Sequence, residues 1–227
     1  EISSAVGSSG HDLAAALSKL LMPMVGKTRT NVRDGYHFVE LIQRRWSRFS
    51  MAARRRGRRV GRMVSLDISA MFPNIPMAEA LEVLEKRLRR FEKSGELAEC
   101  TDLSAAEEVM RLVKEVCAAP YFQCEFGLFK QVDGVPMGGP LSCLISDIFM
   151  EDYEEKVVIK LSDGTVIRAD WLSRFRDDTW MIWEHSQELF FDEFLKKLNG
   201  LHPKIKWETV FEENGQLPFL DVLVVRN

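Results

Sequence analysis

The sequence predicts an α+β fold in which an antiparallel sheet packs on helices. Three observations support this class: a short apolar run at Arg62–Ile68, two further apolar runs on either side of Asp177-Asp178, and helical periodicity in the long segments between them. Because 46% of the 227 residues are hydrophobic, the chain can bury the core of one large domain or of two small ones.

The composition argues against several classes of protein. No apolar stretch reaches the roughly 18 residues that a membrane-spanning helix needs, so we expect no membrane contact. The four cysteines form no CxxC pair and no histidine stands at zinc-finger spacing, which favours free thiols in a reducing intracellular compartment. The chain starts at Glu1 with neither an initiator methionine nor a signal-peptide pattern, so we expect it to be part of a longer protein.

A dense basic segment lies between Arg44 and Arg62, where nine arginines occur without an acidic residue. Trp46 and Phe49 stand among them, and this mixture of cations and aromatic rings suits a phosphate backbone with stacked bases. A solvated loop and a nuclear-import signal are the alternatives. The arginines expected to contact a nucleic acid are Arg54, Arg55, Arg56, Arg58 and Arg59.

The first half of the chain is predicted to be mainly helical. Apolar residues at helical spacing and helix start signals predict helices at Asp12–Met22, at Asp34–Arg48, from Asn74-Ile75-Pro76 onward, and from a capping box at Ser104 to about Cys117. The run Arg62–Ile68 is expected to be a buried strand, and it places Asp67 near the end of that strand.

The second half is predicted to contain paired strands as well as helices. Tyr121–Val132 resembles two strands around Gly127, and Gly134–Pro140 is a turn that leads into a helix through about Lys160. The other predicted elements are a hairpin of Trp171–Phe175 with Thr179–Trp183, a helix at Gln187–Asn199, and a final hairpin of Ile205–Phe211 with Leu217–Val225 through Asn214-Gly215.

Three acidic residues are candidates for a two-metal site. Nucleotide transfer to a primer 3′ oxygen is catalysed by two divalent ions about 4 Å apart, and Mg²⁺ or Mn²⁺ prefers carboxylate ligands. Asp67 at the end of a strand and Asp177-Asp178 at a hairpin tip supply three such groups. They are far apart in the sequence, so the prediction requires their two strands to pair in one antiparallel sheet.

Each acidic motif is common when taken alone, since such residues usually belong to turns or helix caps. The order of the motifs is more specific. Gly134–Ser142 lies between them, and its glycines let the backbone approach a ligand closely before a helix begins. A purely structural turn remains the alternative for this loop.

In this order the motifs resemble those of reverse transcriptases, most closely those of Penelope-like retroelements. Val64–Pro76 resembles the family's first metal motif, Gly134–Ser142 its nucleotide-binding glycine motif, and Phe175–Asp178 its double-aspartate motif. Leu217–Asp221 is similar to the hairpin that grips the primer. The resemblance covers nearly the whole chain and implies the palm of a right-hand polymerase fold with partial helical fingers.

The resemblance also implies a division into segments. Residues 1–62 would be fingers-like helices with the basic segment, and residues 63–76 would belong to the palm. Residues 77–140 would be an insertion of fingers and palm that leads to the glycine motif, and residues 141–227 would be palm ending in the primer-grip-like hairpin. A thumb would follow beyond these residues, so we expect low processivity from the 227 residues alone.

Individual roles follow from the same resemblance. Asp67, Asp177 and Asp178 would be catalytic and would bind two Mg²⁺ or Mn²⁺ ions together with the Ile68 carbonyl. Phe72 would exclude a ribose 2′-hydroxyl, unless it is only a core residue. Expected nucleotide contacts are Phe72, Met137 and Gly138, and the primer or template contacts, besides the five arginines above, are Arg176, Leu217, Pro218 and Phe219.

The implied activity is RNA-directed DNA synthesis. Its partners would be an RNA or DNA template with a primer and deoxynucleoside triphosphates, and its place would be the nucleus. Two residues depart from the family pattern, because Met137 stands where many members have Gln and Arg176 where they have a small apolar residue. The rival hypotheses are a palm-domain nucleotide cyclase and a reverse-transcriptase-like domain that only binds nucleic acid or serves as a scaffold.

Overall fold

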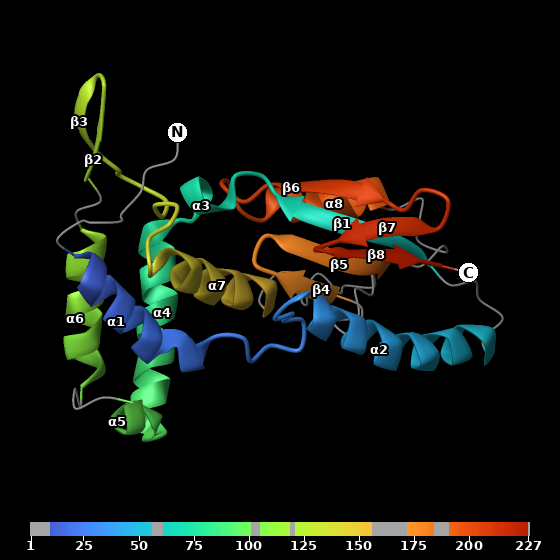
Figure 1. The fold of residues 1–227 in the computed structure, drawn as a ribbon, viewed down its shortest axis with the longest axis horizontal. Helices are drawn as coiled ribbons and strands as arrows, with labels where there is room; N and C mark the ends of the chain where they lie inside the picture. The colour runs from blue at the N-terminus through green and yellow to red at the C-terminus, as the bar shows by residue number, and fades with distance from the viewer. Residues whose placement is uncertain are drawn as a thin grey trace. The chain divides into compact units, whose positions relative to one another are not determined.

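A computed structural model of the chain describes residues 10–55, 61–100, 105–118, 121–155, 172–183 and 191–226. It confirms the α+β class, with an antiparallel sheet packed on helices (Figure 1). The chain divides into two compact units, which are named here the sheet unit and the helical unit. The sheet unit comprises Gly26–Ser69 and Tyr153–Asn227, and the helical unit comprises Glu1–Val25 and Ala70–Asp152.

The sheet unit is built on a four-stranded antiparallel sheet with the strand order β4-β5-β1-β6. Its strands are β1 (Arg62–Ile68), β4 (Leu172–Phe175), β5 (Asp178–Trp183) and β6 (Trp207–Phe211). The strand predicted at 62–68 is confirmed residue for residue, and the hairpin predicted at 171–175 and 179–183 is confirmed to within one residue at each end. The central position of β1 lets one strand pair with both β5 and β6.

One face of this sheet is covered by a helix and a hairpin. They are α2 (Gly35–Arg55), β7 (Gln216–Phe219) and β8 (Val222–Val225). Phe38 of α2 is fully buried, with its ring centroid 5.5 Å from that of Trp180 and 4.5 Å from that of Phe219. Asp34 caps the helix, because its Oδ1 accepts the His37 amide at 2.7 Å. The packing of Phe38 therefore joins α2, the sheet and the hairpin in one core.

The other face of the sheet is covered by α8 (Phe191–Gly200). The ring centroid of Trp183 on β5 lies 5.0 Å from those of Phe191 and Phe194. Both phenylalanines are buried, as the apolar face of an amphipathic helix should be. The sheet thus has an apolar core on each side.

Helices make up most of the helical unit. Their bounds are α1 (His11–Leu21), η1 (Met22–Met24), α3 (Met71–Asn74), α4 (Met77–Lys93), α5 (Glu96–Cys100), α6 (Ala106–Cys117) and α7 (Ser142–Tyr153), whose last residue belongs to the sheet unit. Both α1 and α4 pack on α6, and the hairpin of β2 (Tyr121–Cys124) with β3 (Gly127–Lys130) projects from this unit (Figure 1). A largely buried ion pair joins Arg87 of α4 to Glu151 of α7 at 2.5 Å.

The final hairpin is the clearest correction to the sequence analysis. Asn214 and Gly215 form the predicted tight turn with φ values of 50° and 74°, but β6 then pairs with β1, and β7 pairs with β8. The chain reverses at Leu220, where φ is 52°, so that Leu217 and Phe219 can bury their side chains in the core below α2. The turn signal had predicted that the strands on either side of Asn214-Gly215 pair with each other. Tertiary packing instead pairs β6 with β1 and β7 with β8.

Other predicted elements differ less. The second helix runs on through Arg55, since the alanines and arginines beyond residue 48 are good helix formers, and α5 was not predicted. Ser104 of the capping box, the helix continuation to Lys160 and the helix start at Gln187 lie outside the described residues. None of the helices within the described ranges combines the length and the apolar composition needed to cross a bilayer.

Phe38→Ala is expected to destabilise the sheet unit by about 3–5 kcal/mol, because it leaves a cavity where three elements meet. Urea unfolding followed by tryptophan fluorescence measures this, since all five tryptophans lie within the sheet unit's ranges. Tyr36→Ala is the matched control on the same helix: Tyr36 is 88% exposed, so its loss should change stability by less than about 0.5 kcal/mol. Equal effects of the two substitutions would contradict this account of the core.

Candidate active site

Strand pairing brings the three candidate acids to one end of the sheet. β1 pairs with β5 with Leu66 opposite Thr179, so the next position outward places Asp67 opposite Asp178. Asp177 lies in the two-residue turn of the β4–β5 hairpin, which the Phe175–Asp178 pair closes. The antiparallel pairing that the two-metal prediction required is therefore present.

The carboxyl groups perturb one another. Partial burial, followed by the charge of Asp177 and that of Glu208, raises the pKa of Asp67, and a hydrogen bond from the Ile68 backbone opposes this rise. Burial, followed by the charges of Asp177 and Asp67, raises the pKa of Asp178. Groups that repel one another at the end of a sheet are what a bound cation would stabilise.

Glu208 is a fourth acid that the sequence analysis missed. It lies directly opposite Asp67 in the β1–β6 register, so the two side chains share one face of the sheet. Its Oε1 accepts a hydrogen bond from the Ser69 hydroxyl at 2.6 Å, just beyond the end of β1. No local signal pointed to Glu208, because its neighbourhood depends on the pairing of β6 with β1.

The chemistry of the donor set fits Mg²⁺ or Mn²⁺. The carboxylates are hard oxygen ligands, and the charge of Asp177 is close enough to raise the pKa of both Asp67 and Asp178. Within the described ranges, no three His, Cys, Asp or Glu side chains are gathered closely enough to hold a metal ion as they stand. We therefore expect the acidic side chains to rotate when ions bind.

The turn between β4 and β5 has an unusual backbone. Arg176 adopts φ 56°, in the left-handed region that favours glycine, although it carries a large side chain. Its guanidinium carbon lies 5.3 Å from the centroid of the Phe175 ring, and the residue is exposed. The predicted contact of Arg176 with a primer or template stays a prediction, and the side chain is accessible for it.

The glycine motif is anchored to the segment that contains Phe72, and both belong to the helical unit. The Val135 amide donates to the Phe72 carbonyl at 2.9 Å. Gly134 has φ 73°, and a Cβ there would lie 2.4 Å from the Pro73 carbonyl oxygen, so only glycine fits. The motif is therefore held in place by a contact that excludes every other residue at position 134.

The residues predicted to contact a nucleotide lie next to this hydrogen bond and are at least partly exposed. Phe72 and Met137 are partly buried, and Gly138 is exposed with no atom within 4 Å of where a Cβ would be. The open space at Gly138 leaves its backbone accessible to a ligand. Nucleotide binding by Phe72, Met137 and Gly138 stays a prediction.

The predicted nucleic-acid contacts are described only in part. Arg54 and Arg55 lie on the last turn of α2, whereas Arg56, Arg58 and Arg59 lie outside the described residues. Elsewhere in the basic segment, the Arg45 guanidinium donates to the Arg29 carbonyl at 2.8 Å and to the Ser173 hydroxyl at 3.2 Å. Arg45 therefore fastens α2 to β4 and to the Arg29 segment, a structural role that the charge count did not distinguish.

The primer-grip-like hairpin is β7 with β8. Leu217 and Phe219 are buried in the core below α2, and Pro218 between them is exposed. The two buried side chains thus anchor the hairpin, and a direct contact with a primer would fall to Pro218 and the backbone. Primer binding by this hairpin stays a prediction.

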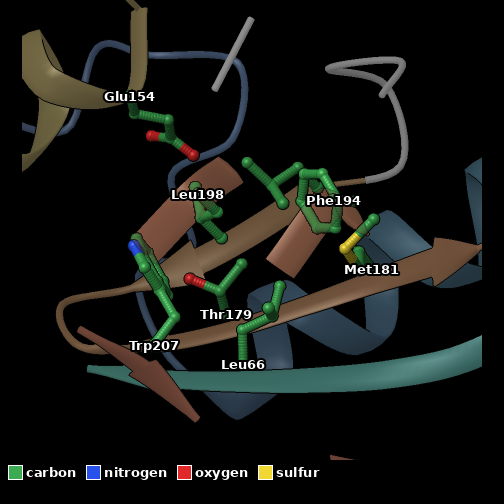
Figure 2. Close-up of a pocket in the computed structure, with 8 residues that line it drawn as sticks. Leu66, Glu154, Thr179, Met181, Phe194, Leu198 and Trp207 are labelled. Atoms are coloured by element: carbon green, nitrogen blue, oxygen red, sulfur yellow. The ribbon is translucent and has the colours of Figure 1, made fainter. Parts of the chain in front are cut away.

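A small cavity lies within the sheet unit, between the β1–β5 pair and α8 (Figure 2). Leu66, Thr179 and Trp207 line it from the strands, Phe194 from α8, and Glu154 points toward it. Its cavity volume is about 10 Å³, which is room for about one water molecule and far below the roughly 300–1,000 Å³ of typical ligand sites. Since it also opens on the face of the sheet opposite Asp67, we do not assign it to a nucleotide.

Comparison with known proteins identifies the fold. No protein-family model matches the sequence, and no curated protein matches it. Telomerase from Candida tropicalis in complex with a TWJ fragment of telomeric RNA matches with a TM-score of 0.65 and 16% identity, over 92% of this chain and 35% of that one. Apo telomerase from C. tropicalis gives 0.59 and 15%, over 92% and 38% of the two chains.

Telomerase from Candida albicans, also in complex with a TWJ fragment of telomeric RNA, gives a TM-score of 0.56 and 16% identity over 94% of this chain and 37% of that one. Telomerase is a reverse-transcriptase-related polymerase, so the chain has a reverse-transcriptase-like fold of palm and partial fingers. At these identities the likeness establishes the fold alone. The chain spans little more than a third of the length of the telomerases it matches.

Asp67→Asn is expected to raise the melting temperature of the metal-free chain at pH 7 by about 1–2 °C, because relieving cross-strand repulsion is worth roughly 0.5 kcal/mol. The raised pKa of Asp67 means that the unfolded chain loses this proton first, so stability falls as pH rises from 3.8 through the folded pKa. The gain should therefore vanish near pH 3, at about which Asp67 is mostly protonated in both states.

Thermal unfolding in EDTA between about pH 3 and pH 8 measures this difference. Asp192→Asn is the matched control, because Asp192 is an exposed acid in the first turn of α8, where a negative charge is slightly favourable. A gain from Asp67→Asn that is the same at every pH would show that charge repulsion is not its cause.

Proposed function

We propose that the chain is the palm, with part of the fingers, of an RNA-directed DNA polymerase of the Penelope-like retroelement branch. The observation that carries this proposal is the register that places Asp67 opposite Asp178, with Asp177 in the adjoining turn. The reverse-transcriptase-like fold supports it, as do the glycine motif and the double-aspartate motif in the same chain order.

Asp67, Asp177 and Asp178 would hold two Mg²⁺ or Mn²⁺ ions, with the Ile68 carbonyl as a further ligand. When bound, such ions activate the primer 3′ oxygen and stabilise the departing pyrophosphate. The chain's own contribution is to keep the backbone of the three acids at one end of a sheet, so that binding of the ions would need rotation of the acidic side chains but no change in the strands. Glu208, opposite Asp67, would add to the negative field that attracts the cations.

The deoxynucleoside triphosphate would lie against the glycine motif and Phe72. The hydrogen bond from Val135 to the Phe72 carbonyl fixes the two segments to each other, which an excluding ring requires. Gly138 would let the backbone approach the nucleotide, and Met137 would pack on it without a strong hydrogen bond. The RNA or DNA template and its primer would contact the basic segment, Arg176 and the β7–β8 hairpin.

Asp177→Asn is expected to lower the rate of primer extension by about a thousandfold, because a metal-bound carboxylate contributes several kcal/mol to the transition state. The assay uses an RNA template, a DNA primer and deoxynucleoside triphosphates with Mg²⁺ or Mn²⁺, under single-turnover conditions. Asp192→Asn, an exposed acid on α8, should keep the wild-type rate.

Two results would count against the proposal. Full activity in Asp177→Asn would show that Asp177 is not a metal ligand. Formation of cyclic dinucleotides without a template would favour a cyclase. Binding of the template-primer duplex with no synthesis by a longer chain that includes a thumb would favour a nucleic-acid-binding scaffold.

Phe72→Val is expected to raise the ratio of ribonucleotide to deoxynucleotide incorporation by about tenfold or more, because the smaller side chain would no longer exclude a 2′-hydroxyl. The measurement is kcat/KM for each nucleotide on the same primer. A variant that is less stable but keeps the wild-type ratio would show that Phe72 is only a packing residue.

A further inference from the structure

We propose that Arg174 is a positioning residue, whose buried guanidinium holds the Arg176 carbonyl and thereby fixes the turn that carries Asp177 and Asp178. This inference rests on the proposed function, because it concerns the readiness of those two carboxylates to bind cations. In this assignment Arg174 acts through the backbone of the turn and is not itself a metal ligand.

Arg174 is one of the most buried residues of the sheet unit. Its exposed fraction is 1%, and a buried guanidinium is stable only when it has an acidic partner and further hydrogen bonds. Glu154, with an exposed fraction of 3%, supplies the acid, and its Oε2 lies 3.3 Å from Arg174 Nε. Such a group is expensive to bury, so its position on the acidic hairpin calls for a specific role.

The guanidinium also reaches the acidic turn. Arg174 Nη1 donates to the Arg176 carbonyl oxygen at 2.9 Å. That carbonyl belongs to the residue with φ 56°, a conformation that an L-residue adopts only at a cost, and it directly precedes Asp177. The hydrogen bond therefore stabilises the one backbone conformation that sets the direction of Asp177.

Arg174 is itself held by a neighbouring segment. Its amide donates to the Thr30 carbonyl at 2.7 Å, and its carbonyl accepts the Val32 amide at 2.8 Å. The Thr30 hydroxyl donates to the same Glu154 oxygen at 2.8 Å. The Thr30 loop, the helical turn at Glu154 and β4 thus all hold Arg174 in place. The guanidinium therefore has little freedom to move away from the Arg176 carbonyl.

Arg174 lies on the opposite face of the sheet from Asp178, so its role is not to neutralise the charge of that carboxylate. Arg174 lies opposite Thr179 in the β4–β5 register, so its side chain is on the cavity side shown in Figure 2, toward which Glu154 points. Asp178, one residue before Thr179, is on the other face. Arg174 consequently acts on the acids through the backbone of the turn.

Arg174→Lys tests the inference, because lysine keeps the positive charge beside Glu154 but lacks the planar fork that reaches two acceptors. We expect Mn²⁺ affinity, measured by electron paramagnetic resonance of free Mn²⁺, to fall about tenfold, as is typical when a residue that orients a ligand is changed. In primer extension, kcat should fall while KM for the nucleotide stays near its wild-type value.

Arg87→Lys is the matched control. Arg87 is also a largely buried arginine that pairs with a buried glutamate and donates to a backbone carbonyl, that of Met24, but it belongs to the helical unit. It should lower the melting temperature without changing Mn²⁺ affinity. If Arg174→Lys likewise lowers only the melting temperature, Arg174 is a structural residue and the inference is wrong.

A second variant gives a result that a general loss of stability would not. Arg176→Gly, combined with Arg174→Lys, should restore part of the lost Mn²⁺ affinity, because glycine adopts φ 56° without cost. A double variant as weak as Arg174→Lys alone would contradict the mechanism.

Hydrogen exchange of the metal-free chain separates this inference from the proposed function. Arg174→Lys should speed exchange in a peptide that spans 172–183, and unchanged exchange there would overturn the positioning role whatever the chain binds. Conversely, faster exchange in the variant with no Mn²⁺ binding by the wild type would support the role in the turn and contradict the metal site.

Discussion

The antiparallel register between β1 and β5 is the constraint on which the candidate site depends. Val64 lies opposite Met181 and Leu66 opposite Thr179, and the core on that face fixes these pairs. A slip by one residue would turn every side chain of β1 to the other face and would move Asp67 into the apolar layer under α8. The acids thus gain their positions from the packing of residues that have no part in the chemistry.

The same sheet carries interactions of opposite sign. At one end, Asp67 is repelled by Glu208, and Asp178 is repelled by Asp67 on the same face. Another acid of the same unit is paired: Arg226 bonds the buried Glu212 and the Gly61 carbonyl, which fastens the end of the last strand to the entry of β1. The repulsion at the end of β1 and β5 thus lies where a bound cation would relieve it.

The parts of the fold that the sequence predicted are those that depend on local patterns. The strand at 62–68 and the hairpin around Asp177 have apolar residues bounded by clear turn signals, and the structure has both. The pairing of β6 was missed because Asn214-Gly215 forms a good turn in either topology, and only the burial of Leu217 and Phe219 decides between them.

The candidate site shows the same limit of local reasoning. Asp67, Asp177 and Asp178 could be found from motif order, whereas Glu208 needed a long-range pairing. Arg174 was passed over because a single arginine in a short strand usually points to solvent, and nothing nearby in the sequence reveals Glu154 or the Thr30 loop as its partners. Buried polar networks are assembled from distant segments, so periodicity does not detect them.

The central place of β1 also has a consequence for synthesis on the ribosome. Leu66 can pair only after Thr179, which lies 113 positions later in the chain, has been synthesised. At about 5–20 residues per second, the apolar run Arg62–Ile68 remains unpaired for roughly 6–23 s after it is made. During that interval the nascent chain exposes an unpaired apolar strand edge, which is an aggregation hazard, and α2, whose residues are already made, is the element available to cover it.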